Sequence, residues 1–203
     1  IDVEDLLGRA QTPLDRNAMR QLIEDKKVLI TGAGGSIGSE LVRQVCGFAP
    51  RTLTLVDSSE YALYTIDLEL SQKWPELDRS AMIADVRDRD RIDQIMQTVS
   101  PDLVFHAAAL KHVPLVEANV CEGLATNVIG TRNVADACVT ANVSAMVVVS
   151  TDKAINPTNI MGASKRLAEI YCQALDLDST SAPNTRFVTV RFGNVLGSTG
   201  SVV

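Results

Sequence analysis

The sequence lacks an excess of basic residues and has no long apolar run. Its 203 residues contain 19 Lys and Arg against 25 Asp and Glu, a formal net charge of −6, so we expect no nucleic-acid partner. No apolar run approaches the roughly 18 residues of a transmembrane helix. Residues 1–21 also lack the basic start and apolar centre of a signal peptide. We therefore expect the chain as given to be soluble.

Cysteines and histidines are too few and too scattered to suggest disulfide bridges or a metal site. The cysteines form no C-x-x-C pair, so we expect small apolar residues in a reducing cytosol; they are Cys46, Cys121, Cys138 and Cys172. His106 and His112 are the only histidines and have no third ligand in view, so we expect no bound metal. We expect His106 to be a core residue rather than a catalyst.

From Lys27 onward, short apolar runs alternate with segments of helical character. The runs read KVLIT, TLTLVD, AMIAD, DLVFHAA, AMVVVST and RFVTVRF. Runs that are apolar on both faces belong to strands covered on both sides, and their alternation with helices indicates right-handed β-α-β units. We therefore predict an α/β domain with a doubly wound, Rossmann-type parallel sheet. The predicted helices are 36–47, 59–74, 88–99, 117–141 and 160–175.

The segment VLITGAGGSIGSELV follows the first predicted strand and opens the first predicted helix, with glycines in a G-x-x-G-x-x-G spacing. Glycine permits positive φ and lets a pyrophosphate approach the backbone, while the helix N-terminus supplies N–H groups and the positive end of its dipole. We expect these residues to bind the phosphates of a dinucleotide; they are Gly32, Gly35, Ser36, Ile37 and Gly38.

The ends of the next strands carry residues suited to the rest of a dinucleotide. Asp57 ends the second strand 19 positions after Gly38, where an acidic residue can bind the adenosine ribose. With Ser58 beside it and no nearby Arg, we predict NAD rather than NADP, because a carboxylate repels a 2′-phosphate. Asp85 and Val86 end the third strand and either hold the adenine edge or, in the case of Asp85, cap the next helix. The small residues Ala107, Ala108 and Ala109 let the backbone come close to the dinucleotide.

The sequence predicts two regions, which divide at residues 25 and 26. Residues 1–25 are charged and weakly periodic, so we expect a linker or packing arm. Residues 26–203 are predicted to form an NAD-binding Rossmann domain that also carries the catalytic residues. The sequence stops soon after the sixth predicted strand, where a complete enzyme of this architecture continues into a substrate-binding lobe. We therefore expect that lobe to be largely missing.

The reaction site is predicted within VVVSTDKAINPTNIMGASKR, where Met161 and Lys165 stand at a spacing that often carries Tyr-x-x-x-Lys. In such an enzyme the lysine lowers the pKa of the tyrosine phenol, which then removes a hydroxyl proton. A thioether has no proton to exchange, so either the chain is inactive or neighbouring polar groups act instead. Thr151, Asp152 and Lys153 follow the fifth strand and offer a carboxyl group that burial can keep protonated and an amine whose pKa burial can depress. The alternative is a solvated turn pair that caps the helix at Ile160.

Several segments together resemble the nucleotide-sugar 4,6-dehydratases of bacterial polysaccharide biosynthesis, within the extended short-chain dehydrogenase/reductase superfamily. They are TGAGGSIG, VDSSEYALY, FHAAALKHVPLVE, NVIGTRNV, STDKAINPTNIMGASKR and RFGNVLGSTGSV. The resemblance is to the large membrane-anchored branch and covers nearly the whole chain. Met161 in the tyrosine position is then a mark of this subgroup.

The resemblance implies dehydration of a UDP-N-acetylhexosamine, typically UDP-N-acetylglucosamine, to a 4-keto-6-deoxy sugar for capsule, lipopolysaccharide or another surface glycan. Tightly held NAD takes hydride from C4 and returns it to C6. By resemblance Asp152 is the acid for the C6 hydroxyl and Lys153 the C5 base, with Thr151 near the sugar hydroxyls and Lys165 on the nicotinamide ribose. The remaining cofactor-side and sugar-side residues it implies are Asn127, Lys111, Asn194 and the turn 200–202.

The resemblance also implies partners and a location. Members of the branch carry a membrane-spanning amino-terminal part, and residues 1–15 resemble the linker that follows it. We therefore expect a parent protein on the cytoplasmic side of the bacterial inner membrane, and a homo-oligomer. Two other functions stay open. A nucleotide-sugar 4-epimerase shares the cofactor loop but normally keeps the tyrosine, and a non-catalytic NAD-binding regulator would not require Thr151, Asp152 and Lys153.

Overall fold

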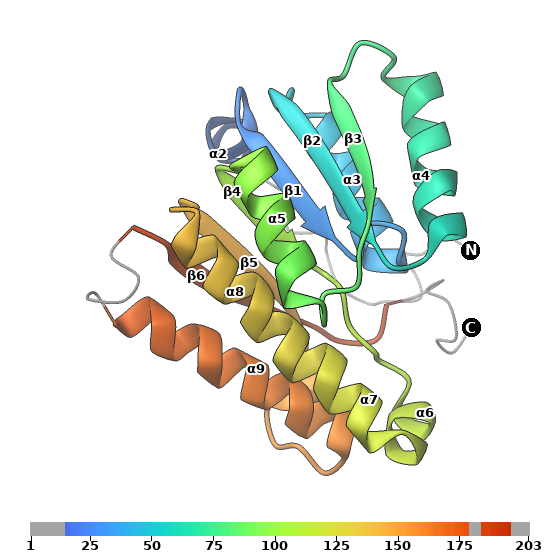
Figure 1. The fold of residues 1–203 in the computed structure, drawn as a ribbon, viewed down its shortest axis with the longest axis vertical. Helices are drawn as coiled ribbons and strands as arrows, with labels where there is room; N and C mark the ends of the chain where they lie inside the picture. Colours follow the sequence, from blue (N-terminus) through green and yellow to red (C-terminus); the bar gives the residue numbers. More distant parts are fainter. Residues whose placement is uncertain (1–14, 179–183, 196–203) are drawn as a thin grey trace.

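The computed structural model describes residues 15–178 and 184–195, in which six strands form one parallel sheet (Figure 1). The strands are β1 (Lys27–Thr31), β2 (Thr52–Asp57), β3 (Arg79–Ile83), β4 (Leu103–His106), β5 (Ala145–Thr151) and β6 (Arg186–Phe192). Their order across the sheet is β3-β2-β1-β4-β5-β6. The predicted doubly wound, Rossmann-type fold is confirmed, and its strand order reverses between β1 and β4, where such sheets bind ligands.

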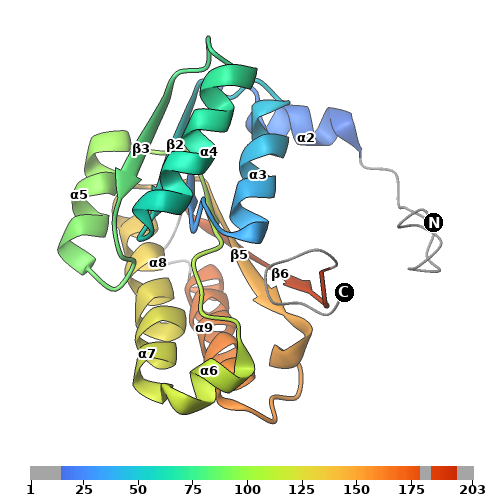
Figure 2. The same cartoon turned by 90° about the vertical axis from the view of Figure 1, so that its right-hand side faces the viewer.

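Helices cover both faces of the sheet, as Figures 1 and 2 show. One face packs against α2 (Arg16–Ile23), α3 (Ser36–Cys46) and α4 (Glu60–Lys73), and the other against α5 (Arg89–Val99), α8 (Thr131–Thr140) and α9 (Ile160–Leu177). Shorter segments are α6 (Val113–Ala118), α7 (Val120–Leu124), a π-helical segment (Ala125–Gly130) and a 3₁₀ turn (Asp152–Ala154). Among the described residues, no helix combines the length and apolar character needed to cross a bilayer.

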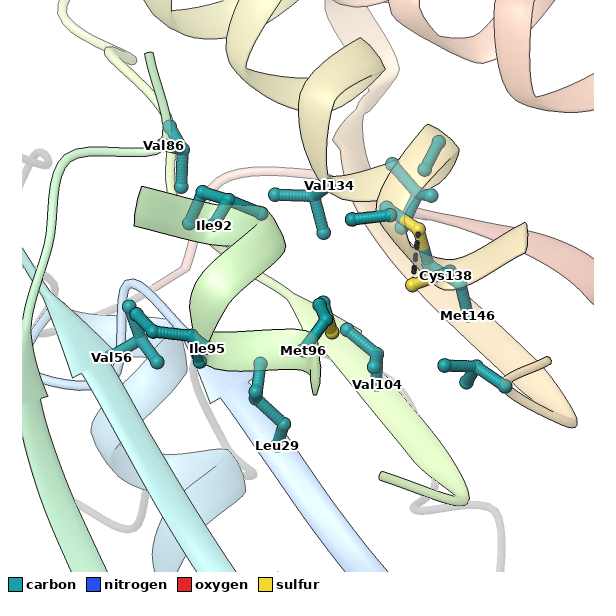
Figure 3. Packing of buried hydrophobic residues seen from close by; sticks show 14 of the residues in the cluster. Leu29, Val56, Val86, Ile92, Ile95, Met96, Val104, Val134, Cys138 and Met146 are labelled. Atoms are coloured by element: carbon teal, nitrogen blue, oxygen red, sulfur yellow. Dashed lines mark hydrogen bonds between the residues drawn. The ribbon is translucent and has the colours of Figure 1, made fainter. Parts of the chain in front are cut away.

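Two apolar layers sandwich the sheet, one for each set of helices. In the layer of Figure 3, Ile95 and Met96 of α5 belong to the same buried cluster as Leu29 of β1 and Val104 of β4. The other layer joins alternate residues of β1, β2 and β4 to α2, α3 and α4. This two-sided burial explains why the strands are apolar runs without strict alternation.

The cysteines follow their predicted role in three cases out of four. Cys46, Cys138 and Cys172 are free and buried, and the Cys138 Sγ lies 3.8 Å from the Met146 Sδ (Figure 3). Cys121 is free but exposed, so it does not pack as a buried apolar residue. It belongs to α7, a short helix of which only Gly123 is buried.

The predicted helix 117–141 is wrong in detail, because the structure divides this region into four segments. Asn119 ends α6 and precedes α7, with a φ of −135° that lies outside the helical range. The π-helical segment then leads into α8 without a break in helical dihedrals, since Thr131 has a φ of −63° and a ψ of −42°. A π-helical turn contains one extra residue, so it rotates the side chains that follow relative to an ideal helix.

Part of the predicted linker or packing arm is helical. Asp15 caps α2 by accepting hydrogen bonds from the amides of Asn17 and Ala18. Ile23, at the end of α2, is 1% exposed and lies in the apolar layer with α3 and α4. This part of the arm therefore packs on the domain, although its weak periodicity did not predict a helix.

Candidate active site

The glycine loop between β1 and α3 forms a turn that larger residues could not make. Gly32 has a φ of +66°, and a Cβ there would lie 2.5 Å from the backbone nitrogen of Ala108. A Cβ on Gly38 would lie 1.9 Å from the Gly32 carbonyl oxygen, so helix α3 packs directly on the turn. Gly35 caps α3, and its Cβ would meet only the Gly32 carbonyl, at 3.3 Å. Because Gly35 has no side chain, a ligand in the cleft could approach the backbone of the loop closely.

The start of α3 opens onto a cleft at the carboxyl ends of the strands. The first backbone N–H groups of a helix have no partner within it, and they carry the positive end of the helix dipole. Ser36, Ile37 and Gly38 of this first turn line the cleft. The arrangement suits the pyrophosphate of a dinucleotide, as the spacing predicted.

The cleft has two connected halves. The half beside α9 and β6 has a volume of about 570 Å³, and the half beside β2 and β3 has one of about 630 Å³. Both halves are lined by Gly35 and by the segment after β4, which includes Ala107 and Lys111. We call them the reaction half and the nucleotide half. Their shared lining lies at the point where the strand order reverses, because it comes from the segments after β1 and β4.

Most predicted site residues line this cleft. In the nucleotide half are Gly32, Gly35, Asp57, Ser58, Asp85, Val86, Ala107, Ala108, Ala109 and Lys111. In the reaction half are Ser36, Ile37, Gly38, Thr151, Lys153, Lys165 and Asn194, together with Gly35, Ala107, Ala109 and Lys111 again. The turn 200–202 lies outside the described residues. Asn127 and Asp152 do not line the cleft.

Asp57 lines the nucleotide half and binds two backbone amides there. Its Oδ2 accepts a hydrogen bond of 2.9 Å from the Gly34 amide, and its Oδ1 accepts one of 2.9 Å from the Ser59 amide. Ser59 in turn caps α4. The carboxylate thus ties the glycine loop to the start of α4 and lies at the end of β2, where a ribose would be bound.

Arg87 is a cleft residue that the sequence reading missed. It lines the nucleotide half with Asp57, although the sequence shows no Arg close to Asp57. Its guanidinium binds Asp85, and the Nη1 also binds Glu122 of α7. Hydrogen bonds from Arg87 hold the pKa of the Asp85 carboxyl below its usual range. The capping alternative for Asp85 is wrong, because Asp88 caps α5.

Asn127 does not line the cleft but is hydrogen-bonded to Leu110, which does. It is fully buried in the π-helical segment. Its Oδ1 accepts from the Leu110 amide at 2.8 Å, and its Nδ2 donates to the Leu110 carbonyl at 2.9 Å and to the Ser164 Oγ at 3.0 Å. The prediction that Asn127 lines the cofactor or sugar side is therefore corrected. It connects the segment after β4 to α9 instead.

His106 is a core residue within a chain of hydrogen bonds, as predicted. Its Nδ1 lies 2.7 Å from the Thr31 Oγ1 and its Nε2 lies 2.9 Å from the Thr131 Oγ1. Since the Thr131 hydroxyl donates to the Asn127 carbonyl, it accepts from Nε2–H, and Nδ1 accepts from Thr31. Burial, and then the charge of Lys165, lower the pKa of His106 to about 3, so the imidazole is neutral.

Thr151, Asp152 and Lys153 form a compact polar group at the carboxyl end of β5. The Lys153 Nζ lies 3.1 Å from the Asp152 Oδ1, and the Thr151 hydroxyl donates to the same oxygen at 3.0 Å. Lys153 also donates to the Asn194 Oδ1 at 3.2 Å, which links β5 to the segment after β6. The alternative of a solvated turn pair that caps the helix is wrong in its capping part, because Asn159 caps α9, although the two side chains do form a partly exposed pair.

Asp152 is not buried, which corrects the physical basis of the predicted acid. Its side chain is 51% exposed. Hydrogen bonds from Lys153 and then from Thr151 hold the pKa of its carboxyl below the usual range. In this structure the group is therefore a carboxylate paired with an ammonium ion. Any acid role requires a proton to move onto it.

Met161 and Lys165 face the reaction half from α9, one helical turn apart. Both side chains are almost fully buried, and burial lowers the pKa of Lys165 to about 8. Gly162 brings the helix against the 3₁₀ turn, because a Cβ there would lie 2.4 Å from the Lys153 carbonyl oxygen. The tyrosine position is thus inside the site and carries a thioether. The described residues contain no group of three or more His, Cys, Asp or Glu side chains placed to hold a metal.

Comparisons with known proteins agree with this architecture. The family model described as polysaccharide biosynthesis protein matches residues 28–203. The chain is 47% identical to the capsular polysaccharide biosynthesis protein CapD of Staphylococcus aureus, with 100% of the chain and 34% of that protein covered. It is 36% identical to a UDP-N-acetylglucosamine 4,6-dehydratase (inverting) of Campylobacter jejuni, with 90% of the chain and 53% of that protein covered.

Two further similarities bear on fold and function. A UDP-glucose 4-epimerase of Rickettsia rickettsii is 37% identical, with 88% of the chain and 52% of that protein covered. The X-ray structure of Pen from Bacillus thuringiensis superposes with a TM-score of 0.80 at 37% identity, covering 89% of this chain and 53% of that one. The chain thus spans between about a third and a half of the proteins it matches. Because the family model covers 28–203, the chain belongs to the polysaccharide biosynthesis protein family.

Proposed function

We propose that the chain is the cofactor-binding and catalytic part of an NAD-dependent nucleotide-sugar 4,6-dehydratase that acts on a UDP-N-acetylhexosamine. One observation carries the proposal: Met161 occupies the tyrosine position inside the cleft, while Lys153, which lines the same half, forms an ion pair with Asp152. The 36% identity to a protein named as a UDP-N-acetylglucosamine 4,6-dehydratase supports this choice of reaction. The family description supports a role in making surface polysaccharide.

The residues that line the cleft suit a nicotinamide dinucleotide. The glycine turn and the α3 N-terminus suit the pyrophosphate, and Asp57 and Ser58 suit the adenosine ribose. When bound, NAD supplies the acceptor for the C4 hydride and its return to C6. Lys165 lies in the reaction half, where its amine would bind the nicotinamide ribose. Lys111 and Asn194 line the same half and would contact the sugar nucleotide.

The Lys153–Asp152 pair explains how a charged pair could serve as base and acid in the elimination step. Moving one proton from the ammonium to the carboxylate, across 3.1 Å, produces a neutral amine and a carboxylic acid together. Exclusion of water by the substrate favours this neutral form, because burial disfavours charge. The Lys153 amine then takes the C5 proton, while Asp152 gives its proton to the departing C6 hydroxyl, which leaves as water. The elimination restores the original ion pair. The C4 hydroxyl proton released on oxidation and the C5 proton taken up when hydride returns to C6 would both be exchanged with solvent through this polar group.

A 4-epimerase is the second candidate, because a protein with that name is 37% identical. Met161 argues against it, because by the resemblance a 4-epimerase normally keeps the tyrosine at this position.

One experiment separates these functions. The full-length protein is incubated with UDP-N-acetylglucosamine, and the products are measured by mass spectrometry and NMR. A 4,6-dehydratase yields a product lighter by one water, an epimerase yields an isomer of unchanged mass, and a regulator binds NAD and yields neither. An isomer, or no product from a protein shown to hold NAD, would refute the proposed reaction.

A further inference from the structure

Glu169 and Lys165 are the only buried charged side chains among the described residues, and both belong to α9. Lys165 already has a place in the proposed site. Glu169 follows one helical turn later, is 3% exposed and does not line the cleft. A buried carboxylate is costly unless hydrogen bonds satisfy it. Its partners therefore show what the fold uses it for.

The main partner of Glu169 is Arg191 of β6. The Arg191 Nε donates to Oε1 at 2.9 Å, and its Nη2 donates to Oε2 at 2.6 Å. Arg166 adds a third donor to Oε2, at 3.0 Å. A bidentate fork of this kind fixes direction as well as distance. Glu169 thus holds the guanidinium of Arg191 in one orientation against α9.

The strand that Arg191 belongs to lies at the edge of the described sheet and ends at the cleft. In the described sheet, β6 is an edge strand that pairs only with β5. Phe192, Gly193 and Asn194 follow Arg191 directly and line the reaction half. Asn194 in turn accepts the hydrogen bond from the Lys153 ammonium. A shift of the β6 end would therefore displace a direct neighbour of the proposed base.

We propose that the Glu169–Arg191 pair is a positioning device that sets the end of β6, and through Asn194 the side chain of Lys153, relative to Lys165 on α9. Glu169 and Arg191 touch neither substrate nor cofactor in this role. The pair connects the end of β6, where Asn194 contacts Lys153, to α9, which carries Met161 and Lys165. The proposal rests on the proposed function for its kinetic consequence, and on the structure alone for its geometric one.

The same two elements supply a matched control at their other ends. Arg186, the first residue of β6, donates through Nε to the Asp176 Oδ1 of α9 at 2.9 Å. Asp176 also accepts from the Phe187 amide. This pair likewise joins α9 to β6, but neither residue lines the cleft. It therefore reports what a tether contributes to stability alone.

The test compares Arg191→Lys with Arg186→Lys in the full-length protein loaded with NAD. Each variant keeps its charge and loses its planar fork. We expect Arg191→Lys to lower kcat for UDP-N-acetylglucosamine by roughly 10- to 100-fold with little change in KM, because small misplacements of reacting groups have effects of that size. We expect Arg186→Lys to keep the wild-type kcat. An equal fall in both variants, or no fall in Arg191→Lys, would overturn the proposal.

Backbone hydrogen exchange provides an arm that does not depend on the reaction. In Arg191→Lys, exchange should rise at Gly193 and Asn194, whereas in Arg186→Lys it should rise near Phe187. If the wild-type protein does not convert UDP-N-acetylglucosamine, the proposed function fails, and the exchange data still decide the positioning role. Unchanged exchange at Gly193 and Asn194 refutes it. If Arg191→Lys folds poorly, the double variant Glu169→Gln/Arg191→Gln is used instead, because it makes both members of the pair neutral. Its kcat and its backbone hydrogen exchange are then compared with those of Arg186→Lys.

Discussion

At the scale of single residues, Met161 decides how the site is interpreted. It lies in the reaction half one turn before Lys165 and is 3% exposed. Its thioether can neither donate nor accept a catalytic proton, so proton transfer falls to its polar neighbours. Lys153 lines the same half and is paired with Asp152, which makes these two the residues to change.

Three variants test this assignment in the full-length protein. Asp152→Asn should keep the fold and the NAD content but lower turnover by roughly 10²–10⁴, the usual scale for a positioned acid or base. Lys153→Ala should suppress solvent deuterium exchange at C5, because that exchange requires removal of the C5 proton. Met161→Leu is the control and should change turnover little, since it conserves volume and polarity. If Met161→Leu abolishes turnover while the other two remain active, the assignment is wrong.

A second residue, Asp57, should set cofactor preference. We expect NAD to bind at least about tenfold more tightly than NADP, a difference of about 1.4 kcal/mol, because the Asp57 carboxylate would face a 2′-phosphate. Arg87 lines the same half but is already bound to Asp85 and Glu122. Asp57→Asn should reduce the preference for NAD over NADP, as measured by calorimetry with both dinucleotides. Glu60→Gln removes an equal charge three residues away and should leave the ratio of NAD to NADP affinity unchanged.

The residues that sequence reading found and missed differ in a simple physical way. Gly32, Gly38 and Asp57 could be predicted, because their roles follow from local backbone geometry and from spacing along one β-α-β unit. Glu169 and Arg191 could not, since 22 residues separate them and only the packing of α9 on β6 brings them together. The protonation of Asp152 was also beyond the sequence, because it depends on exposure and on the contact with Lys153.

At the scale of elements, the π-helical segment connects the two sides of the cleft. It places Asn127 where one side chain can bind both backbone groups of Leu110 and the hydroxyl of Ser164. The strands were predictable because each is a short apolar run covered on both faces. The division of 117–141 was not, since hydrophobic periodicity does not show the extra residue of a π-helical turn.

This arrangement predicts that Asn127 controls dinucleotide affinity without touching the ligand. Asn127→Ala removes the two hydrogen bonds to the part-buried Leu110 backbone and the buried one to Ser164, each typically worth about 0.5–1.5 kcal/mol. Because Leu110 lines both halves of the cleft, we expect NAD affinity to fall together with stability. Asp102→Ala is the matched control: it removes the carboxylate that accepts the Lys27 amide at the opposite edge of the sheet. Equal NAD affinity in the two variants, by calorimetry, would contradict the prediction.

At the scale of the whole molecule, the hydrogen-bonded chain through His106 makes stability depend on pH. The imidazole lies between Thr31 of β1 and Thr131 of α8, with no exposed surface. Its pKa falls from 6.5 to about 3, first because of burial and then because of Lys165. Between these values the unfolded chain binds a proton that the folded chain does not. The free energy of unfolding must therefore decrease as pH falls from 6.5 towards 3.

Between pH 6 and 5, carboxylates contribute least to the pH dependence of stability, so this range isolates the effect of His106. Between pH 6 and 5 we expect the free energy of unfolding, measured with urea, to fall by about 1.4 kcal/mol per pH unit at most from this one group. His106→Asn should be less stable at pH 7 but should lose most of the slope, because no proton is then taken up there on unfolding. His112→Asn, which changes the other histidine, should keep the slope. A slope that survives in His106→Asn would show that His106 is not held neutral in the folded chain.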